Sequence, residues 1–172
     1  VVMALSAVPA LIFSLLVPKM VEKFDKMKIF MFCGFITVAL SIVMWLLGYS
    51  NIWLIVALYV IRAVPQSIMG VMMFMFTPDC AEYGKFKSGI EAKGITFSIQ
   101  TFMTKLTGAI SSALYLFLLG VIKWKDVSAA ENFDQLKEMG ITQTPETLDG
   151  LWFLFIMVPA IGVALGCVFW AF

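Results

Sequence analysis

Five long apolar stretches constrain this chain more than any other feature. Each approaches or exceeds the roughly 20 apolar residues that a helix needs to cross the hydrocarbon core of a bilayer. The sequence is 62% hydrophobic and 13% charged, whereas soluble domains are about 45–50% apolar and about 25% charged. We therefore expect an all-α integral membrane protein of about five transmembrane helices, at residues 1–18, 29–47, 52–76, 93–122 and 151–172.

Prolines and polar segments separate these stretches. The first and third helices are expected to end near Pro18 and at Thr77-Pro78, because proline disfavours helical backbone in the residue before it. Residues 48–51 predict a tight turn. Loops at 19–28 and 77–92 and a polar segment at 123–150 complete the chain, and residues 130–139 of that segment predict a short surface helix.

The distribution of lysines predicts the orientation in the membrane. The 19–28 and 77–92 loops, with Lys93 at their boundary, hold seven lysines, whereas the 123–150 segment holds three lysines among six acidic residues. Positively charged loops stay on the cytoplasmic side. We therefore expect the two loops to be cytoplasmic and residues 123–150 to be external, in a multi-pass protein of the cell (inner) membrane.

Several classes of function are excluded by composition. The net charge of +1 gives no basic surface for nucleic acid, and the absence of histidine excludes His-ligated metals and His-based triads. The three cysteines form no CxxC pair. No acid–base pair, nucleophile or cofactor loop is present, so an enzyme is not expected. Because the chain begins at Val1 and ends at Phe172 inside apolar runs, we expect a fragment of a longer protein.

A lysine lies near the middle of the fourth predicted helix. Intramembrane lysine costs about 2.5–3.5 kcal/mol on insertion scales and usually faces a cavity or a partner. Small and polar residues recur beside Lys105 at helical spacing and form one stripe. Such a stripe indicates either a substrate pathway or close helix packing. Its members are Thr101, Thr104, Lys105, Gly108, Ser111, Ser112 and Tyr115.

Arg62 lies at a similar depth in the third predicted helix, with Gln66 one turn further on. Pro65 removes a backbone hydrogen bond there and is expected to kink or loosen the helix. No carboxylate occurs at comparable depth in the sequence. The partner of Arg62 must then be a ligand, a helix outside this chain or another subunit.

Two motifs in the second half of the chain match one family. Asp79-x-x-Glu82-Tyr83-Gly84-x-Phe86-Lys87-Ser88-Gly89 is followed by Gly94-x-x-Phe97-Ser98-x-Gln100-Thr101-Phe102-x-x-Lys105-Leu106, and later by Gln143-Thr144-Pro145-Glu146-Thr147-Leu148-x-Gly150. These motifs resemble glycoside–pentoside–hexuronide:cation symporters (melibiose permease-like) of the major facilitator superfamily. The resemblance implies that the five helices are helices 8–12 of a twelve-helix fold with two six-helix halves.

The resemblance also implies roles for particular residues. Lys105 matches a lysine that links the sugar and cation sites, and Asp79 and Glu82 match acidic positions near the cytoplasm. The chain departs from the family pattern at Lys85, which stands where an acid is expected, and at Glu91 and Lys93, where the signs of the two charges are exchanged. The carboxylates that bind the coupling cation lie in the amino-terminal half, so the cation, Na⁺ or H⁺, is not identified. No other cofactor and no metal site are expected.

These observations together predict the carboxyl-terminal part of a secondary transporter that couples uptake of a sugar or glycoside to a cation by alternating access. Its partners would be the substrate, the cation, the bilayer and the missing amino-terminal half. Residues expected at the substrate and coupling site are Lys105, Thr101, Thr104, Arg62, Gln66 and Tyr115. Residues expected at a cytoplasmic gate are Asp79, Glu82, Tyr83, Gly84, Lys87, Glu91 and Lys93. The alternatives are a non-transporting module that binds a partner chain and an exporter of small hydrophobic compounds.

Overall fold

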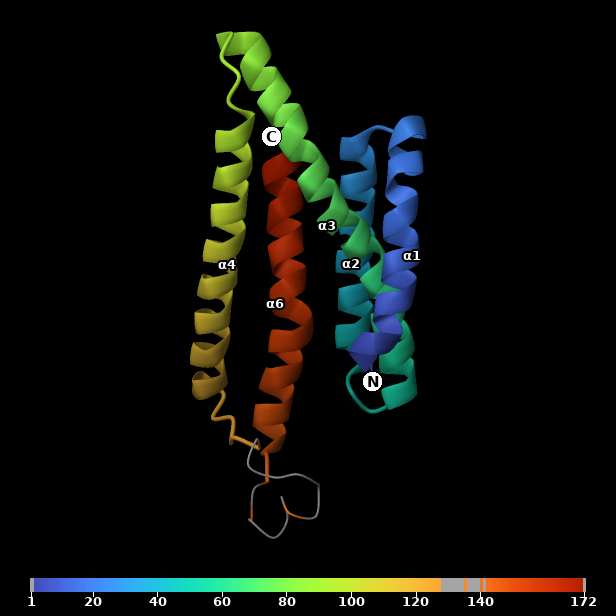
Figure 1. Cartoon of the computed structure of the whole chain (residues 1–172). Coiled ribbons are helices and arrows are strands. Elements are labelled where there is room, and N and C mark those ends of the chain that lie inside the picture. Colours follow the sequence, from blue (N-terminus) through green and yellow to red (C-terminus); the bar gives the residue numbers. More distant parts are fainter. Residues whose placement is uncertain (1, 128–134, 136–139, 141, 172) are drawn as a thin grey trace.

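The computed structural model describes residues 2–127, 135, 140 and 142–171, with side chains from residue 6 to residue 170 within those ranges. Its helices are α1 (Val2–Lys23), α2 (Lys26–Leu47), α3 (Ile52–Ser88), α4 (Lys93–Val121) and α6 (Pro145–Ala171). Successive helices run in opposite directions (Figure 1). The α1–α2 and α3–α4 connections therefore lie at one end, which we call the lysine-rich end, and the α2–α3 connection lies at the other.

Capping residues set the ends of the middle helices. The carboxylate of Asp25 accepts a hydrogen bond from the Met27 N–H (2.8 Å) at the start of α2. The Asn51 side chain accepts one from the Leu54 N–H (3.4 Å) at the start of α3. Between these helices Gly48 has a φ of 64°, which only glycine adopts freely. The turn therefore falls at residues 48–51, where glycine and asparagine indicated it.

The predicted ends of the first and third helices are wrong. Helix α1 continues through Pro18 to Lys23, and α3 continues through Pro65 and Pro78 to Ser88. A proline removes one helical hydrogen bond, but a helix that packs against neighbours can continue past it. Val17, directly before Pro18, is completely buried. The predicted 19–28 and 77–92 loops are thus short connections at residues 24–25 and 89–92.

The last helix begins earlier than predicted, at Pro145 instead of residue 151. The Thr144 hydroxyl accepts a hydrogen bond from the Thr147 N–H (3.2 Å), and Pro145 occupies the first helical position, where proline is favoured. The polar residues of this first turn obscured the start of the helix. The predicted surface helix at 130–139 falls almost entirely outside the described residues.

One apolar cluster holds α1, α2 and α3 together at the lysine-rich half of the molecule. Its buried members are Val17, Ile29, Phe30, Cys33, Ile68 and Met72. Helix α6 joins this cluster through Trp170, whose ring lies 4.8 Å from that of Phe76 and 5.9 Å from that of Phe30. Gly34 of α2 allows a close approach, because a Cβ there would collide with the sulfur of Cys167 in α6.

Helix α4 stands apart from this packed group. No described residue of α4 is buried, and its few contacts are mainly with α3, which crosses obliquely from the α1–α2 pair toward α4 (Figure 1). Gln100 Nε2 donates a hydrogen bond from α4 to the Met73 carbonyl oxygen of α3 (3.3 Å).

Four of the described helices, α2, α3, α4 and α6, are long and apolar enough to cross a membrane. Five such helices were expected, and the described part of α1 is not among the four. The described side chains of α1 begin at Ser6 and include Lys19, Glu22 and Lys23 in its last turns.

Candidate functional site

A cavity of about 550 Å³ lies between α3, α4 and α6. Binding pockets for small molecules usually enclose about 300–1,000 Å³. Residues at three- and four-residue spacing share one helix face, and each of the three helices supplies such a set. The lining residues are Tyr59, Arg62, Gln66, Ser111, Leu114, Tyr115, Leu118, Leu154, Phe155, Val158, Pro159 and Gly162.

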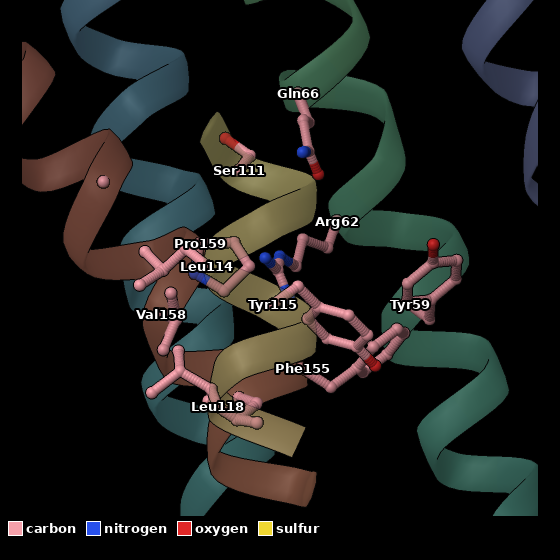
Figure 2. A pocket seen from close by; sticks show the side chains of 12 residues that line it. Tyr59, Arg62, Gln66, Ser111, Leu114, Tyr115, Leu118, Phe155, Val158 and Pro159 are labelled. Carbon is pink, nitrogen blue, oxygen red and sulfur yellow. The ribbon is translucent and has the colours of Figure 1, made fainter. Parts of the chain in front are cut away.

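Arg62 is the only charged residue among those that line the cavity. Its side chain is 4% exposed, and its Nε has no hydrogen-bond partner within the described residues. Figure 2 shows the guanidinium extending from α3 toward Leu114 and Pro159. A buried donor without a partner costs about 1–3 kcal/mol. An acceptor from a bound molecule or from another part of the protein would remove that cost.

Aromatic rings and neutral polar groups flank the guanidinium on opposite sides. Tyr59 stacks on Phe155 with ring centroids 5.7 Å apart and ring planes 17° apart. These two rings and Tyr115 lie on one side of Arg62, and Gln66 and Ser111 lie on the other (Figure 2). The cavity therefore offers one cation, hydroxyl and amide groups, and flat apolar surfaces to the same ligand.

Three residues expected at the site do not line this cavity. Lys105, Thr101 and Thr104 are exposed on α4. Lys105 lies about 9 Å from Ser111 along the axis of α4, by the helical rise of 1.5 Å per residue, on the side of the lysine-rich end. The hydroxyls of Thr101 and Thr104 donate to the Phe97 and Gln100 carbonyl oxygens of α4 itself (2.9 and 2.8 Å).

Among the described residues, Lys105 is exposed and has no charged partner. The helix that carries it is unburied. A second protein surface facing α4 would be needed to pair the ammonium group. Arg62, Gln66 and Tyr115 are thus brought together by the fold, and Lys105 is not brought to them.

Ion pairs connect the helices at the lysine-rich end. Lys26 of α2 and Asp79 of α3 approach to 2.5 Å. Glu91 in the α3–α4 connection accepts from Lys85 at 2.9 Å and lies 3.9 Å from Lys93. The residues at which the sequence departs from the family pattern therefore pair with one another. All five side chains are partly or largely exposed, and such pairs contribute about 0–1 kcal/mol each.

The other expected gate residues lie on the last turns of α3. Glu82, Tyr83, Gly84 and Lys87 were placed in a loop by the sequence analysis, but they are helical and exposed. Neither Glu82 nor Lys87 forms an ion pair within the described residues. Because α3 has 37 residues and is about 55 Å long, its end extends beyond a hydrocarbon core of about 30 Å.

Hydrogen bonds connect the helices at the opposite end. The Tyr49 hydroxyl in the α2–α3 turn donates to Asp149 Oδ1 of α6 (2.9 Å). This hydrogen bond, and secondarily desolvation and the nearby carboxylate charge, raises the pKa of Tyr49. Gln143 bonds both the N–H and the carbonyl oxygen of Lys125 (3.3 and 2.7 Å), which closes the connection after α4.

Several residues of the cavity and of the lysine-rich end were not predicted from the sequence. Tyr59 precedes Arg62 by three residues, and this helical spacing was a usable signal. Phe155 carried no signal that separates it from the other aromatic residues of α6. Lys26 was counted only among the lysines that orient the chain, because its pairing with Asp79 joins residues 53 positions apart.

No group of three or more His, Cys, Asp or Glu side chains in the described part of the chain could hold a metal ion. The polar groups of the cavity, amide, hydroxyl and guanidinium, are ones that recognise an organic ligand through hydrogen bonds.

The comparisons of this chain with a family model and with individual proteins agree with one another. A family model described as "MFS/sugar transport protein" matches residues 1–172. An uncharacterized symporter, YjmB, of Bacillus subtilis (strain 168) is 28% identical over 148 residues, which cover 86% of this chain and 29% of that protein. A glucuronide carrier protein homolog of Escherichia coli (strain K12) is 29% identical over 112 residues, 62% of this chain and 23% of that protein.

A raffinose carrier protein of Pediococcus pentosaceus is 27% identical over 104 residues, which cover 60% of this chain and 16% of that protein. The chain thus spans less than a third of the length of each of these three relatives. No solved structure matches.

Proposed function

The chain belongs to the MFS/sugar transport protein family, and from this premise we propose that it is part of a cation-coupled symporter for a sugar or glycoside. The family is one of membrane transporters and not of enzymes. Relatives named as a symporter, a glucuronide carrier homolog and a raffinose carrier support the proposal. Coupling, substrate class and the correspondence to helices 8–12 belong to this proposal.

The observation that carries the proposal is the unpartnered Arg62 in a cavity with hydroxyl, amide and aromatic groups. A sugar presents hydroxyls around its edge and C–H groups on its faces. Gln66 and Ser111 offer hydrogen bonds to the edge, and the tyrosines offer flat surfaces to a face. Tyr59, Tyr115 and Phe155 provide this aromatic surface within the chain itself.

The arrangement of α3 and α4 supports an alternating-access mechanism. Both helices line the cavity, and both lead to the ion-paired connection at the lysine-rich end. Since α4 is sparsely packed against the other described helices, it is free to move with a surface outside this chain. Lys105 would link carboxylates of the amino-terminal half to substrate occupancy, and the Lys26–Asp79 and Lys85–Glu91 pairs would act at the cytoplasmic gate.

The test is uptake by the full-length protein in membrane vesicles with an imposed Na⁺ or H⁺ gradient and a panel of labelled glycosides. At least one glycoside should accumulate with one of the gradients and not without it. Gln66→Ala and Tyr115→Leu should each lower apparent affinity about tenfold or more, the loss expected for a hydrogen bond or ring contact to substrate. Leu116→Ala is the matched control, because Leu116 is exposed on α4 and outside the cavity lining.

Two outcomes would overturn the proposal. A partner-binding module would accumulate no glycoside with either gradient and would co-purify with a stable acidic membrane partner. An exporter would instead lower the retention of hydrophobic dyes and be insensitive to glycosides. Equal uptake by the Tyr115→Leu and Leu116→Ala variants would mean that the cavity is not the substrate site, even if the protein proved to be a symporter.

A further inference from the structure

A second hollow of the molecule lies between α1, α2 and α3 and is unrelated to the cavity around Arg62. It encloses about 1140 Å³ and is lined by apolar side chains and three lysines, with no acidic residue among its lining. Several of its apolar side chains are exposed in the chain: Phe13, Leu16, Phe32 and Ile61. We call this hollow the basic groove.

The charges of the basic groove all lie at one end of it. Lys19 and Lys23 are four residues apart on α1, and Lys28 is in the first turn of α2, beside the α1–α2 connection. None of the three forms an ion pair within the described residues, whereas the nearby Lys26 is paired with Asp79. The groove is therefore an apolar trough with three lysines at one end, none of them in an ion pair within the described residues, although Glu22 and Asp25 lie in the same stretch of the chain.

The depth of the groove matches one leaflet of a bilayer. Its lining runs from Lys19 to Pro9 along α1, and from Lys28 to Ile36 along α2. By the helical rise of 1.5 Å per residue these distances are about 15 Å and about 12 Å. Half of a hydrocarbon core is also about 15 Å. The lysines therefore lie at headgroup level when the apolar lining lies among acyl chains.

We propose that the basic groove binds one anionic phospholipid of the leaflet at the lysine-rich end. The phosphate lies among Lys19, Lys23 and Lys28, and one acyl chain lies along α1 and α2. Charge selects this occupant, because a zwitterionic lipid or an apolar helix would bring no net negative charge to the three ammonium groups. Basic pockets between membrane helices on the cytoplasmic side bind anionic headgroups by the same physics.

The test uses the full-length protein, purified in a mild detergent and depleted of lipid. Phosphatidylglycerol is titrated and the bound lipid is counted by native mass spectrometry. Phosphatidylcholine tests whether charge is needed, and inorganic phosphate tests whether the acyl chain is needed. We expect saturable binding of one phosphatidylglycerol, at least tenfold weaker binding of phosphatidylcholine and no retained phosphate.

Two variants divide the site into its charged and apolar parts. Each lysine near an anionic lipid surface changes binding about fivefold, so K19Q/K23Q/K28Q together should weaken phosphatidylglycerol binding about 100-fold. Its matched control is K85Q/K87Q/K93Q, which removes the same charge at the same end but outside the groove. Ile61→Trp fills the groove without touching a lysine and should also release the lipid.

Several results would overturn the proposal. These are equal binding of the two lipids, equal loss of binding in the two triple-lysine variants, and unchanged binding in the Ile61→Trp variant. A wild-type protein that binds no phosphatidylglycerol would show that another helix or chain covers the groove. The comparison of the two lipids uses only the wild-type protein. The proposal can therefore be refuted even if a variant misfolds.

Discussion

Helices α2 and α4 are both long and apolar enough to cross a membrane, but they pack very differently in the fold. Helix α2 buries seven residues, from Ile29 to Met44, and packs mainly against α3 and α6. Helix α4 buries none of its described residues. The hydroxyl side chains of the two helices also differ in burial. Thr37 and Ser41 of α2 are fully buried, whereas Thr101 and Thr104 of α4 are exposed.

The difference shows that hydropathy determines that a helix enters the membrane but not what it packs against. Helix α2 finds packing partners for one of its faces within this chain. Helix α4 carries an apolar face suited to lipid, and it carries Lys105, which lipid does not satisfy. The polar face of α4 buries no residue against another described part of this chain, and in the proposed symporter the amino-terminal half would cover it.

The largest expected effect is that of Lys105→Leu in the full-length protein. Because Lys105 makes no ion pair within the described residues, its loss should not reduce expression, but cation-coupled accumulation of substrate should be abolished. The measurement is uptake in vesicles with expression quantified in parallel. Phe102→Leu, an exposed position on the same helix, is the control and should transport normally. Normal accumulation by Lys105→Leu would refute the coupling role.

A glycine pair tests the packing difference directly. Gly34→Ala should destabilise the protein by about 1–3 kcal/mol, because the new methyl group overpacks the α2–α6 contact at Cys167. Gly108→Ala on α4 meets no atom within 4 Å and should be neutral or slightly stabilising, since alanine favours helix more than glycine.

Thermal unfolding in detergent measures both glycine variants. Adding Cys167→Ala to Gly34→Ala should recover part of the loss, because it removes the sulfur that the new methyl group meets. Equal stability of the two single variants would mean that α4 is as closely packed in the full protein as α2 is here.

The ion pairs at the lysine-rich end should matter for rate more than for stability. Asp79→Asn should change the free energy of unfolding by less than about 1 kcal/mol, because the pair with Lys26 is partly exposed. If the pair belongs to the gate, the transport rate should fall several-fold. The exchange Lys26→Asp with Asp79→Lys should restore the rate. Failure of the exchange together with an unchanged rate in Asp79→Asn would remove this pair from the gate.

The smallest expected effect is that of Tyr49→Phe at the opposite end. The Tyr49–Asp149 hydrogen bond raises the pKa of Tyr49 above its ordinary value, about 10. A raised pKa means that the stabilisation is fully present below the ordinary value and is lost as the pH rises through the raised one. Tyr49→Phe should therefore slightly lower the melting temperature at pH 7. A difference that persisted at higher pH, above the raised value, would point to another cause.

Local signals in the sequence were sufficient for some features and not for others. Asn51 and Gly48 marked the α2–α3 turn because capping and positive φ are properties of single residues. Pro18 and Pro78 misled for the converse reason. A proline lowers helix stability locally, but burial of neighbours such as Val17 compensates, and burial depends on distant residues.

The candidate site likewise has some features that single residues indicate and others that depend on how the helices pack. Arg62, Gln66 and Tyr115 were selected because polar side chains are costly in apolar helices, and this cost can be read at each position. Their convergence could not be read, because it depends on the oblique path of α3 between the α1–α2 pair and α4 (Figure 1). Lys105 was selected by the same cost and lies outside the cavity lining, since helical position alone does not specify which neighbour a side chain meets.

The sequence by itself determined the helical class, the existence of four helices long and apolar enough to cross a membrane, the lysines gathered at one end, and two cations in apolar helices without a carboxylate at similar depth. These are sums of single-residue transfer energies along the chain. Only the tertiary structure decided that Tyr59 stacks on Phe155 beside Arg62, that Lys26 pairs with Asp79, and that three further lysines border an apolar groove. Each of these joins residues from different helices, and their meeting depends on how whole helices cross.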